Sequence, residues 1–246
     1  MKAFRALFRS EFVLALRDMN LPIFGIAFPV IVALAIGLIT GNKPVEGAVY
    51  GFVDQSFGAF AAISICATGL MGLPLILSDY RHKKILKRFM VTPVSPGVLL
   101  LVQGVINVVY CAISFFLLYG MCALFWGYRM AGNAGVFLLC YLLTVCAIYS
   151  LGMMLASVAR DVKSANILCS LLYFPMLFFS GATIPYEIMP KGAQMVMDIL
   201  PLTQGIKLLK TAALGLQMEG AFLSILILAV VTVVCTVLSI RFFRWE

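Results

Sequence analysis

Long apolar runs alternate with short polar and basic segments along the whole chain. Six such runs cover residues 21–39, 57–77, 98–125, 134–158, 165–180 and 221–240. Because an α-helix rises about 1.5 Å per residue, runs of roughly 20 residues match the hydrocarbon thickness of a bilayer. The pattern predicts an all-α integral membrane protein with six transmembrane helices, organised as one transmembrane domain over residues 1–246.

The segment before the first run, residues 1–20, is basic and amphipathic. Its apolar side chains recur at helical spacing, and Lys and Arg residues occupy the other positions. This pattern is typical of a helix that lies in the membrane interface with its apolar side in the bilayer. We therefore expect an N-terminal interfacial helix, and a plain basic tail is the alternative.

Residues 181–220 separate the fifth run from the sixth. Gly181, Pro185, Pro190 and Pro201 divide this segment into apolar stretches that are too short to span a bilayer. A structureless connection of this length is uncommon in a compact fold. We expect one or two short re-entrant helices in the outer leaflet, and an irregular external loop is the alternative.

Composition supports a membrane protein. Hydrophobic residues make up 63% of the chain and charged residues only 11%, whereas soluble domains carry about 25% charged residues. The net charge of +8 does not indicate nucleic-acid binding, because the basic residues lie between the apolar runs. Most of them fall on one side of the membrane in the predicted topology. Because basic loop residues are enriched on the cytoplasmic side, this places both termini in the cytoplasm.

Several kinds of chemistry are absent from the sequence. None of the six apolar runs contains Asp, Glu, Lys, Arg or His, although ion-coupled transporters and intramembrane enzymes usually place such groups in the membrane. The seven cysteines lie in apolar runs without metal-ligand spacing, so we expect no metal site. The sequence also lacks a GxxxxGK[ST] phosphate-binding loop, so it cannot hydrolyse ATP by that chemistry alone.

The loop of residues 79–97, DYRHKKILKRFMVTPVSPG, carries a stronger signal. Residues 80–90 can form a short amphipathic helix, which Thr92 and Pro93 end because proline disfavours helix in the residue before it. A basic loop bound to anionic lipid headgroups is the alternative. The apolar edge of the predicted helix comprises Ile85, Leu86 and Phe89. Its charged edge comprises Arg81, Lys84, Lys87 and Arg88.

This loop, together with FFSGATIPYEIMP and the later ILPLT, resembles the type 2 ABC-transporter permease family. That family forms the integral-membrane half of many bacterial drug and polymer exporters. The resemblance covers nearly the whole chain, because the amphipathic start, the six spans, the short loop and the outer segment follow in the family's order. Many members have Gly-Thr where Lys84 and Ile85 stand, and acidic residues nearby where this loop is basic.

The resemblance implies partners. Two permease subunits would pair, as a homodimer or alternatively a heterodimer, and each would sit on an ABC ATPase subunit that binds ATP and Mg²⁺. This chain would then need no cofactor and would not itself be an enzyme. The loop would be the coupling helix that contacts the ATPase through Arg81, Lys84, Ile85, Leu86, Lys87, Arg88 and Phe89.

The resemblance also implies a substrate path between paired second and fifth spans. Its candidates are Phe57, Phe60, Thr68, Asn166, Phe174, Phe178 and Phe179. The alternative is that the phenylalanines face lipid or neighbouring helices. An aromatic, uncharged path suits an amphipathic, drug-like, peptide or lipid-like substrate, exported across the bacterial cytoplasmic membrane. Gln103 and Asn107 are interpreted as interhelical hydrogen-bond partners rather than substrate ligands.

Two other functions remain open from the sequence. One is a stand-alone secondary transporter or channel, against which the uncharged spans and the lack of duplicated halves argue. The other is a membrane enzyme or assembly factor, which would require convergent polar side chains that the sequence does not display. Membrane lipid is an expected partner in every case, and nucleic acid is not.

Overall fold

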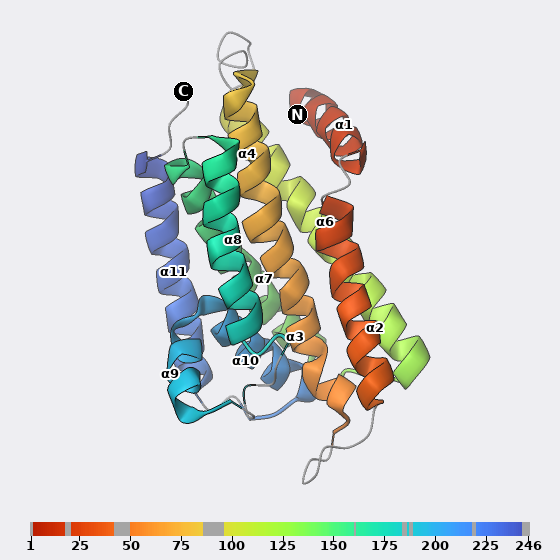
Figure 1. The fold of residues 1–246 in the computed structure, drawn as a ribbon. Helices are drawn as coiled ribbons and strands as arrows, with labels where there is room; N and C mark the ends of the chain where they lie inside the picture. The colour runs from red at the N-terminus through yellow and green to blue at the C-terminus, as the bar shows by residue number, and fades with distance from the viewer. Residues whose placement is uncertain are drawn as a thin grey trace.

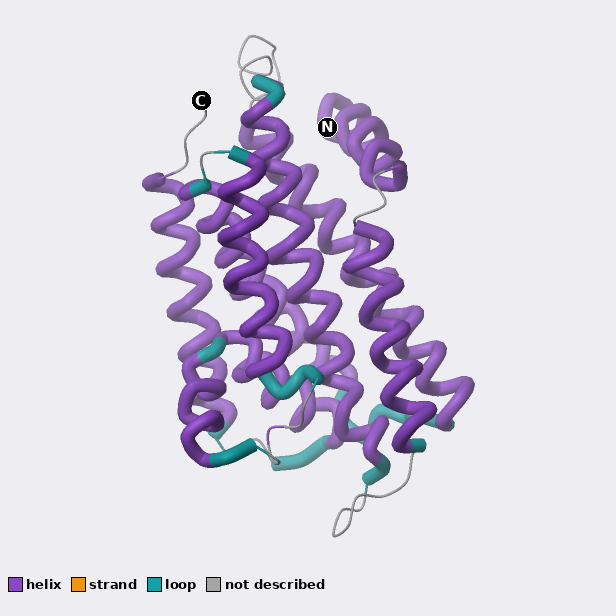
Figure 2. The backbone as a smooth tube through the Cα atoms, viewed as in Figure 1, coloured by secondary structure: helices purple, strands orange, loops and turns teal. Residues whose placement is uncertain are grey.

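The computed structural model describes residues 2–17, 21–41, 50–85, 96–159, 161–183, 186, 189–217 and 220–242. Helices account for nearly all of this length (Figure 2). Among the described residues, six helical stretches are long and apolar enough to cross a membrane, which confirms the six predicted spans. They are Pro22–Thr40, Phe52–His82, Gly97–Trp126, Ala134–Val158, Val162–Phe179 and Ala221–Phe242.

The first two spans each contain a π-helical turn. The first consists of η1 (Pro22–Ala27) and α2 (Phe28–Thr40), and the second of α3 (Phe52–Cys66), η2 (Ala67–Gly72) and α4 (Leu73–His82). Each π-helical turn ends two residues before a proline, Pro29 or Pro74. Since proline lacks an N–H group, it interrupts the regular hydrogen bonding of the helix at these points.

The remaining spans are continuous helices. They are α6 (Pro96–Trp126), α7 (Ala134–Val158), α8 (Val162–Phe179) and α11 (Ala221–Phe242). The second span and α7 are the most buried, and α11, α10, α4 and η2 all pack on α7. The core of the bundle is therefore built around the second and fourth spans.

The N-terminal segment forms α1 (Lys2–Arg17), which packs on the start of α6. Phe4, Leu7, Phe8 and Phe12 contact a small apolar cluster that includes Val102 of α6. In Figure 1, α1 lies at the end of the bundle that also carries the C-terminal end of α11. The helix is therefore present as expected, while its position in a membrane interface stays a prediction.

The segment between α8 and α11 contains two short helices, α9 (Lys191–Ile199) and α10 (Pro201–Leu214). Both lie at the end of the bundle opposite α1 (Figure 1). α10 is largely buried against α3, α7 and α11. The contact with α3 is close at Gly58, where a Cβ atom would lie 2.9 Å from the backbone nitrogen of Lys210. α10 is thus part of the core, and its depth in a bilayer is still a prediction.

Candidate functional site

The predicted coupling segment begins at the end of α4. Lys83 makes an ion pair of 2.7 Å with Asp79, and Arg81 donates a 2.7 Å hydrogen bond to the carbonyl oxygen of Ala159 after α7. Lys84 has a φ of 57°, in the left-handed region that glycine prefers at helix ends. Of the other candidates, Ile85 is partly exposed, and Leu86, Lys87, Arg88 and Phe89 lie outside the described residues.

The predicted substrate-path residues fall into two groups. Phe57, Phe60 and Thr68 are at most 1% exposed and contact the chain's own side chains. Phe57 stacks on Tyr128, with ring centroids 4.4 Å apart. In this conformation these three residues pack the core and reach no outer surface.

The second group lies on α8 and does reach the surface. Phe174, Phe178 and Phe179 are each about half exposed, and Asn166 is exposed on the same helix. Asn166 and Phe174 also line a shallow pocket on the outside of α8. α8 therefore carries the path candidates that a second chain or a substrate can contact.

Thr68 belongs to a chain of hydrogen bonds that crosses the bundle. Tyr149 of α7 donates to Thr68 at 2.9 Å, and Thr68 donates to the carbonyl oxygen of Ser64 at 2.8 Å. Ser64 in turn donates to the carbonyl oxygen of Gly25 in η1 at 2.9 Å. These hydroxyl groups link the first, second and fourth spans.

A second polar cluster joins α1, α4 and α6. Glu11 is only 7% exposed and accepts hydrogen bonds from the hydroxyl of Tyr80 and, at 2.7 Å, from Nε2 of Gln103. Asn107 donates to the carbonyl oxygen of Gln103 at 2.9 Å. The expectation that Gln103 makes interhelical hydrogen bonds is therefore correct, whereas the bond from Asn107 stays within α6.

Sequence reasoning missed Glu11 as part of this cluster. A signal was present, because Glu11 follows Phe4 and Phe8 at helical spacing and so occupies a position on the apolar side of α1. An acidic residue at such a position indicates a buried polar contact rather than a solvated charge.

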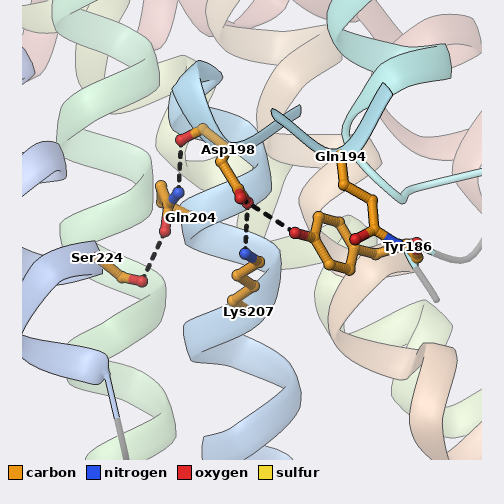
Figure 3. Close-up of polar contacts among 6 residues, drawn as sticks. All are labelled: Tyr186, Gln194, Asp198, Gln204, Lys207 and Ser224. Carbon is orange, nitrogen blue, oxygen red and sulfur yellow. Dashed lines mark hydrogen bonds and ion pairs between the residues drawn. The ribbon is translucent and has the colours of Figure 1, made fainter. Parts of the chain in front are cut away.

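At the opposite end, polar contacts hold the segment after α8 together (Figure 3). Asp198 at the end of α9 forms an ion pair of 2.6 Å with Lys207 of α10. It also accepts a 3.0 Å hydrogen bond from the hydroxyl of Tyr186. Gln204 donates to the carbonyl oxygen of Asp198 at 2.6 Å and accepts a 2.7 Å bond from Ser224 of α11. We call these residues the cap cluster.

The predicted breakpoints of this segment lie at helix ends. Gly181 has a φ of 86° just after α8, Pro190 precedes the first residue of α9, and Pro201 is the first residue of α10. Pro185 lies outside the described residues. The cap cluster itself was not predicted, because its members come from four separate segments, namely the loop at Tyr186 and the helices α9, α10 and α11.

Asp161, in the connection between α7 and α8, caps the N-terminus of α8. Ser164 donates its backbone N–H to the carboxylate of Asp161 at 2.6 Å, and the Ser164 hydroxyl accepts from the N–H of Asp161. The hydrogen bonds from Ser164 hold the pKa of Asp161 below its usual range. Within the described part of the chain, no group of His, Cys, Asp or Glu has the arrangement of a metal site.

Comparison with known proteins adds a family. Residues 2–214 match the family model described as ABC-2 type transporter. The chain is 25% identical over 171 residues to the inner membrane transport permease YhhJ of Escherichia coli K12, covering 68% of this chain and 44% of the relative. It is 32% identical over 102 residues to nodulation protein J of Rhizobium leguminosarum bv. viciae, covering 42% of this chain and 39% of the relative. The chain thus spans less than half the length of these relatives.

Proposed function

The chain belongs to the ABC-2 type transporter family, and on that premise we propose that it is the transmembrane half of an ATP-driven exporter. Its membership makes it a multi-pass permease subunit rather than a catalytic enzyme, and permeases of this family work with ABC ATPase subunits. The finer proposal is that two copies of this chain pair and that each contacts one ATPase, which carries ATP and Mg²⁺.

The observation that supports coupling is the placement of four features at one end of the bundle. α1, the end of α4, the start of α6 and the end of α11 all lie there, opposite α9 and α10 (Figure 1). We assign this end to the cytoplasm, because the described parts of the two basic segments, residues 2–17 and 79–85, gather on it. A bacterial cytoplasmic membrane is the proposed location, by similarity to the inner membrane permease.

Two sets of hydrogen bonds would transmit the proposed coupling motion to the helices. Arg81 ties the end of α4 to the backbone after α7, and Glu11 ties α1 to both α4 and α6. A displacement of the segment 79–97 by an ATPase would therefore move several helices together. The proposed path for an amphipathic substrate lies along α8, where Phe174, Phe178 and Phe179 are exposed.

The test is co-purification of this chain with a co-expressed ABC ATPase in detergent, with ATP hydrolysis as the second readout. Replacing Leu86 and Phe89 by Asp should abolish complex formation, because both are assigned to the apolar edge that enters the ATPase. Arg88→Glu should weaken the complex in low salt.

Lys191→Glu is the matched control, since Lys191 is an exposed cation at the opposite end of the bundle. It should leave co-purification unchanged. If the chain alone moves substrate across liposomes without ATP or an ATPase, the exporter proposal is wrong and a secondary transporter is indicated.

A further inference from the structure

A cavity of about 820 Å³ opens at the end of the bundle that carries α1. It lies between α1, η1, η2, α4, α6 and the start of α8. Most of its wall is apolar, formed by side chains such as Leu21, Met71 and Ile76. It reaches the outside of the chain beside Leu14 and Phe24, which are 53% and 44% exposed. A long alkyl chain therefore has both an entrance and an apolar surface here.

Glu11 places a buried carboxylate in the wall of this cavity. Its hydrogen-bond donors, the Tyr80 hydroxyl and the Gln103 amide, are both neutral. Among the described residues, Glu11 makes no ion pair with Lys or Arg. A carboxylate removed from water is costly unless a cation or a proton neutralises it.

A second group on the wall lacks a partner. Gln103 is 2% exposed, and its Oε1 atom has no hydrogen-bond partner in the described part of the chain. One turn further along α6, Oδ1 of the fully buried Asn107 is also without a partner. Both atoms are acceptors that lack a donor, and of the two residues Gln103 lines the cavity.

The basic residues on the cavity wall lie toward solvent and do not supply these donors. Lys83 is 60% exposed and pairs with Asp79 at the rim. Lys163, near the start of α8, is exposed. The interior of the cavity therefore carries one negative charge and an unpaired acceptor, while the positive charges stay at its mouth.

We infer that this cavity binds the protonated amine of an amphiphile, with its N–H groups on Glu11 and Gln103 and its alkyl chain on the apolar wall. A trimethylated ammonium has the charge but no N–H group, and an alcohol has the hydrogen bond but no charge. Neither therefore matches the site. One part of the inference rests on the proposed function, namely that the bound amine is a substrate for export. An exported amine and an ethanolamine lipid share this chemistry.

The test is photo-crosslinking of the purified chain in phosphatidylcholine nanodiscs with dodecylamine that carries a diazirine in its chain. No ATPase is present, so failure of the exporter proposal does not affect the result. Mass spectrometry should place adducts on α1 and α4, and excess dodecylamine should remove them. Dodecanol and dodecyltrimethylammonium should compete at least about tenfold less well, as expected for the loss of one charge or its hydrogen bonds.

Glu11→Gln should reduce labelling at least about tenfold. Asp161→Asn is the matched control, because it removes one exposed negative charge at the same end of the bundle and should leave labelling within about twofold of wild type. Competition by phosphatidylethanolamine identifies a lipid as the source of the amine, and competition by dodecylamine alone favours an exported amine.

The competition series on the wild-type chain decides the matter even if Glu11→Gln does not fold. Equal competition by dodecanol and dodecylamine would show a merely apolar cavity and overturn the inference. Undiminished labelling of a folded Glu11→Gln variant would also overturn it, because Glu11 would then hold a proton or a structural hydrogen bond only.

Discussion

The hydroxyl of Ser64 in the second span donates a 2.9 Å hydrogen bond to the carbonyl oxygen of Gly25 in the first. In a regular α-helix that carbonyl would accept from the N–H of residue 29, but residue 29 is proline. Ser64 therefore gives this carbonyl, in an apolar environment, a hydrogen bond that the α-helical pattern cannot supply here. The proline in one span and the serine in the next form one structural unit.

Replacing Ser64 with Ala should lower the free energy of unfolding by about 1 kcal/mol, the usual scale for a hydrogen bond between membrane helices. Thermal unfolding in detergent measures the change. Ser10→Ala is the control, because the Ser10 hydroxyl lies on the exposed side of α1 and donates to the carbonyl oxygen of Leu7 in the same helix. Equal stability of the two variants would contradict the role given to Ser64.

Gly152 in α7 should not tolerate a methyl group. A Cβ atom there would lie 2.0 Å from the carbonyl oxygen of Gly69, which forces the fourth span away from the second. Gly152→Ala should destabilise the protein by about 1–3 kcal/mol or more. Gly120→Ala in α6 is the control, since nothing lies within 4 Å of the new atom. That variant should be neutral or up to about 1 kcal/mol more stable in the same unfolding assay.

Lys84 adopts a left-handed conformation at the end of α4, with a φ of 57°. Lys84→Gly should therefore raise the stability of this helix end by about 1 kcal/mol, because glycine adopts such angles without strain. Lys83 has a φ of −76° and pairs with Asp79, so Lys83→Gly should have the opposite effect. Hydrogen exchange of the α4 amides distinguishes the two outcomes, and identical behaviour would refute the conformational argument.

The cap cluster should respond to the loss of Lys207. The ion pair with Asp198 is partly exposed, so Lys207→Met should cost only about 0.2–1 kcal/mol. The effect should be local and appear as faster hydrogen exchange in α9, since Asp198 joins α9 to both Tyr186 and α10. Lys191→Met at the exposed start of α9 is the control. A charge exchange of Asp198 and Lys207 should restore part of the protection.

The cap at the start of α8 should depend on pH. Because the hydrogen bonds from Ser164 lower the pKa of Asp161 in the folded state, the cap contributes to stability above the usual aspartate pKa range. Its contribution is lost as the pH falls through the lowered value. The protection factor of the Ser164 amide proton, its intrinsic exchange rate divided by the observed rate at the same pH, should fall over that range, and in Asp161→Ala it should be low at every pH. A protection factor that stays constant in the wild type would contradict the assignment.

Hydropathy predicted the six spans because each depends only on a local run of apolar residues that matches the bilayer. The end of the second span shows the limit of this approach, since the helix continues from Leu77 to His82 through polar residues. Length and composition locate a span, and hydrogen bonding determines where its helix ends.

The buried aromatic and acidic residues were beyond a sequence argument. From the sequence, Phe57 could equally face lipid, a substrate or the core. Its contacts with rings from distant segments, among them Tyr128, place it in the core. Glu11 and Gln103 likewise meet across 92 residues of sequence. Contacts of this kind depend on which helices pack together, and apolar periodicity does not specify that in a chain whose helices are apolar on nearly every side.

The burial of α10 also bears on how the chain is made. α10 fills the core against α3 and α7, yet it is synthesised after five of the six spans. The earlier spans are therefore inserted in the membrane but incompletely packed until residues 201–214 leave the ribosome and pack between them. A nascent chain arrested before this point would expose the buried faces of α3 and α7 to lipid, chaperones and membrane proteases. Quality control would then distinguish a finished molecule from an unfinished one by a helix outside the six candidate spans.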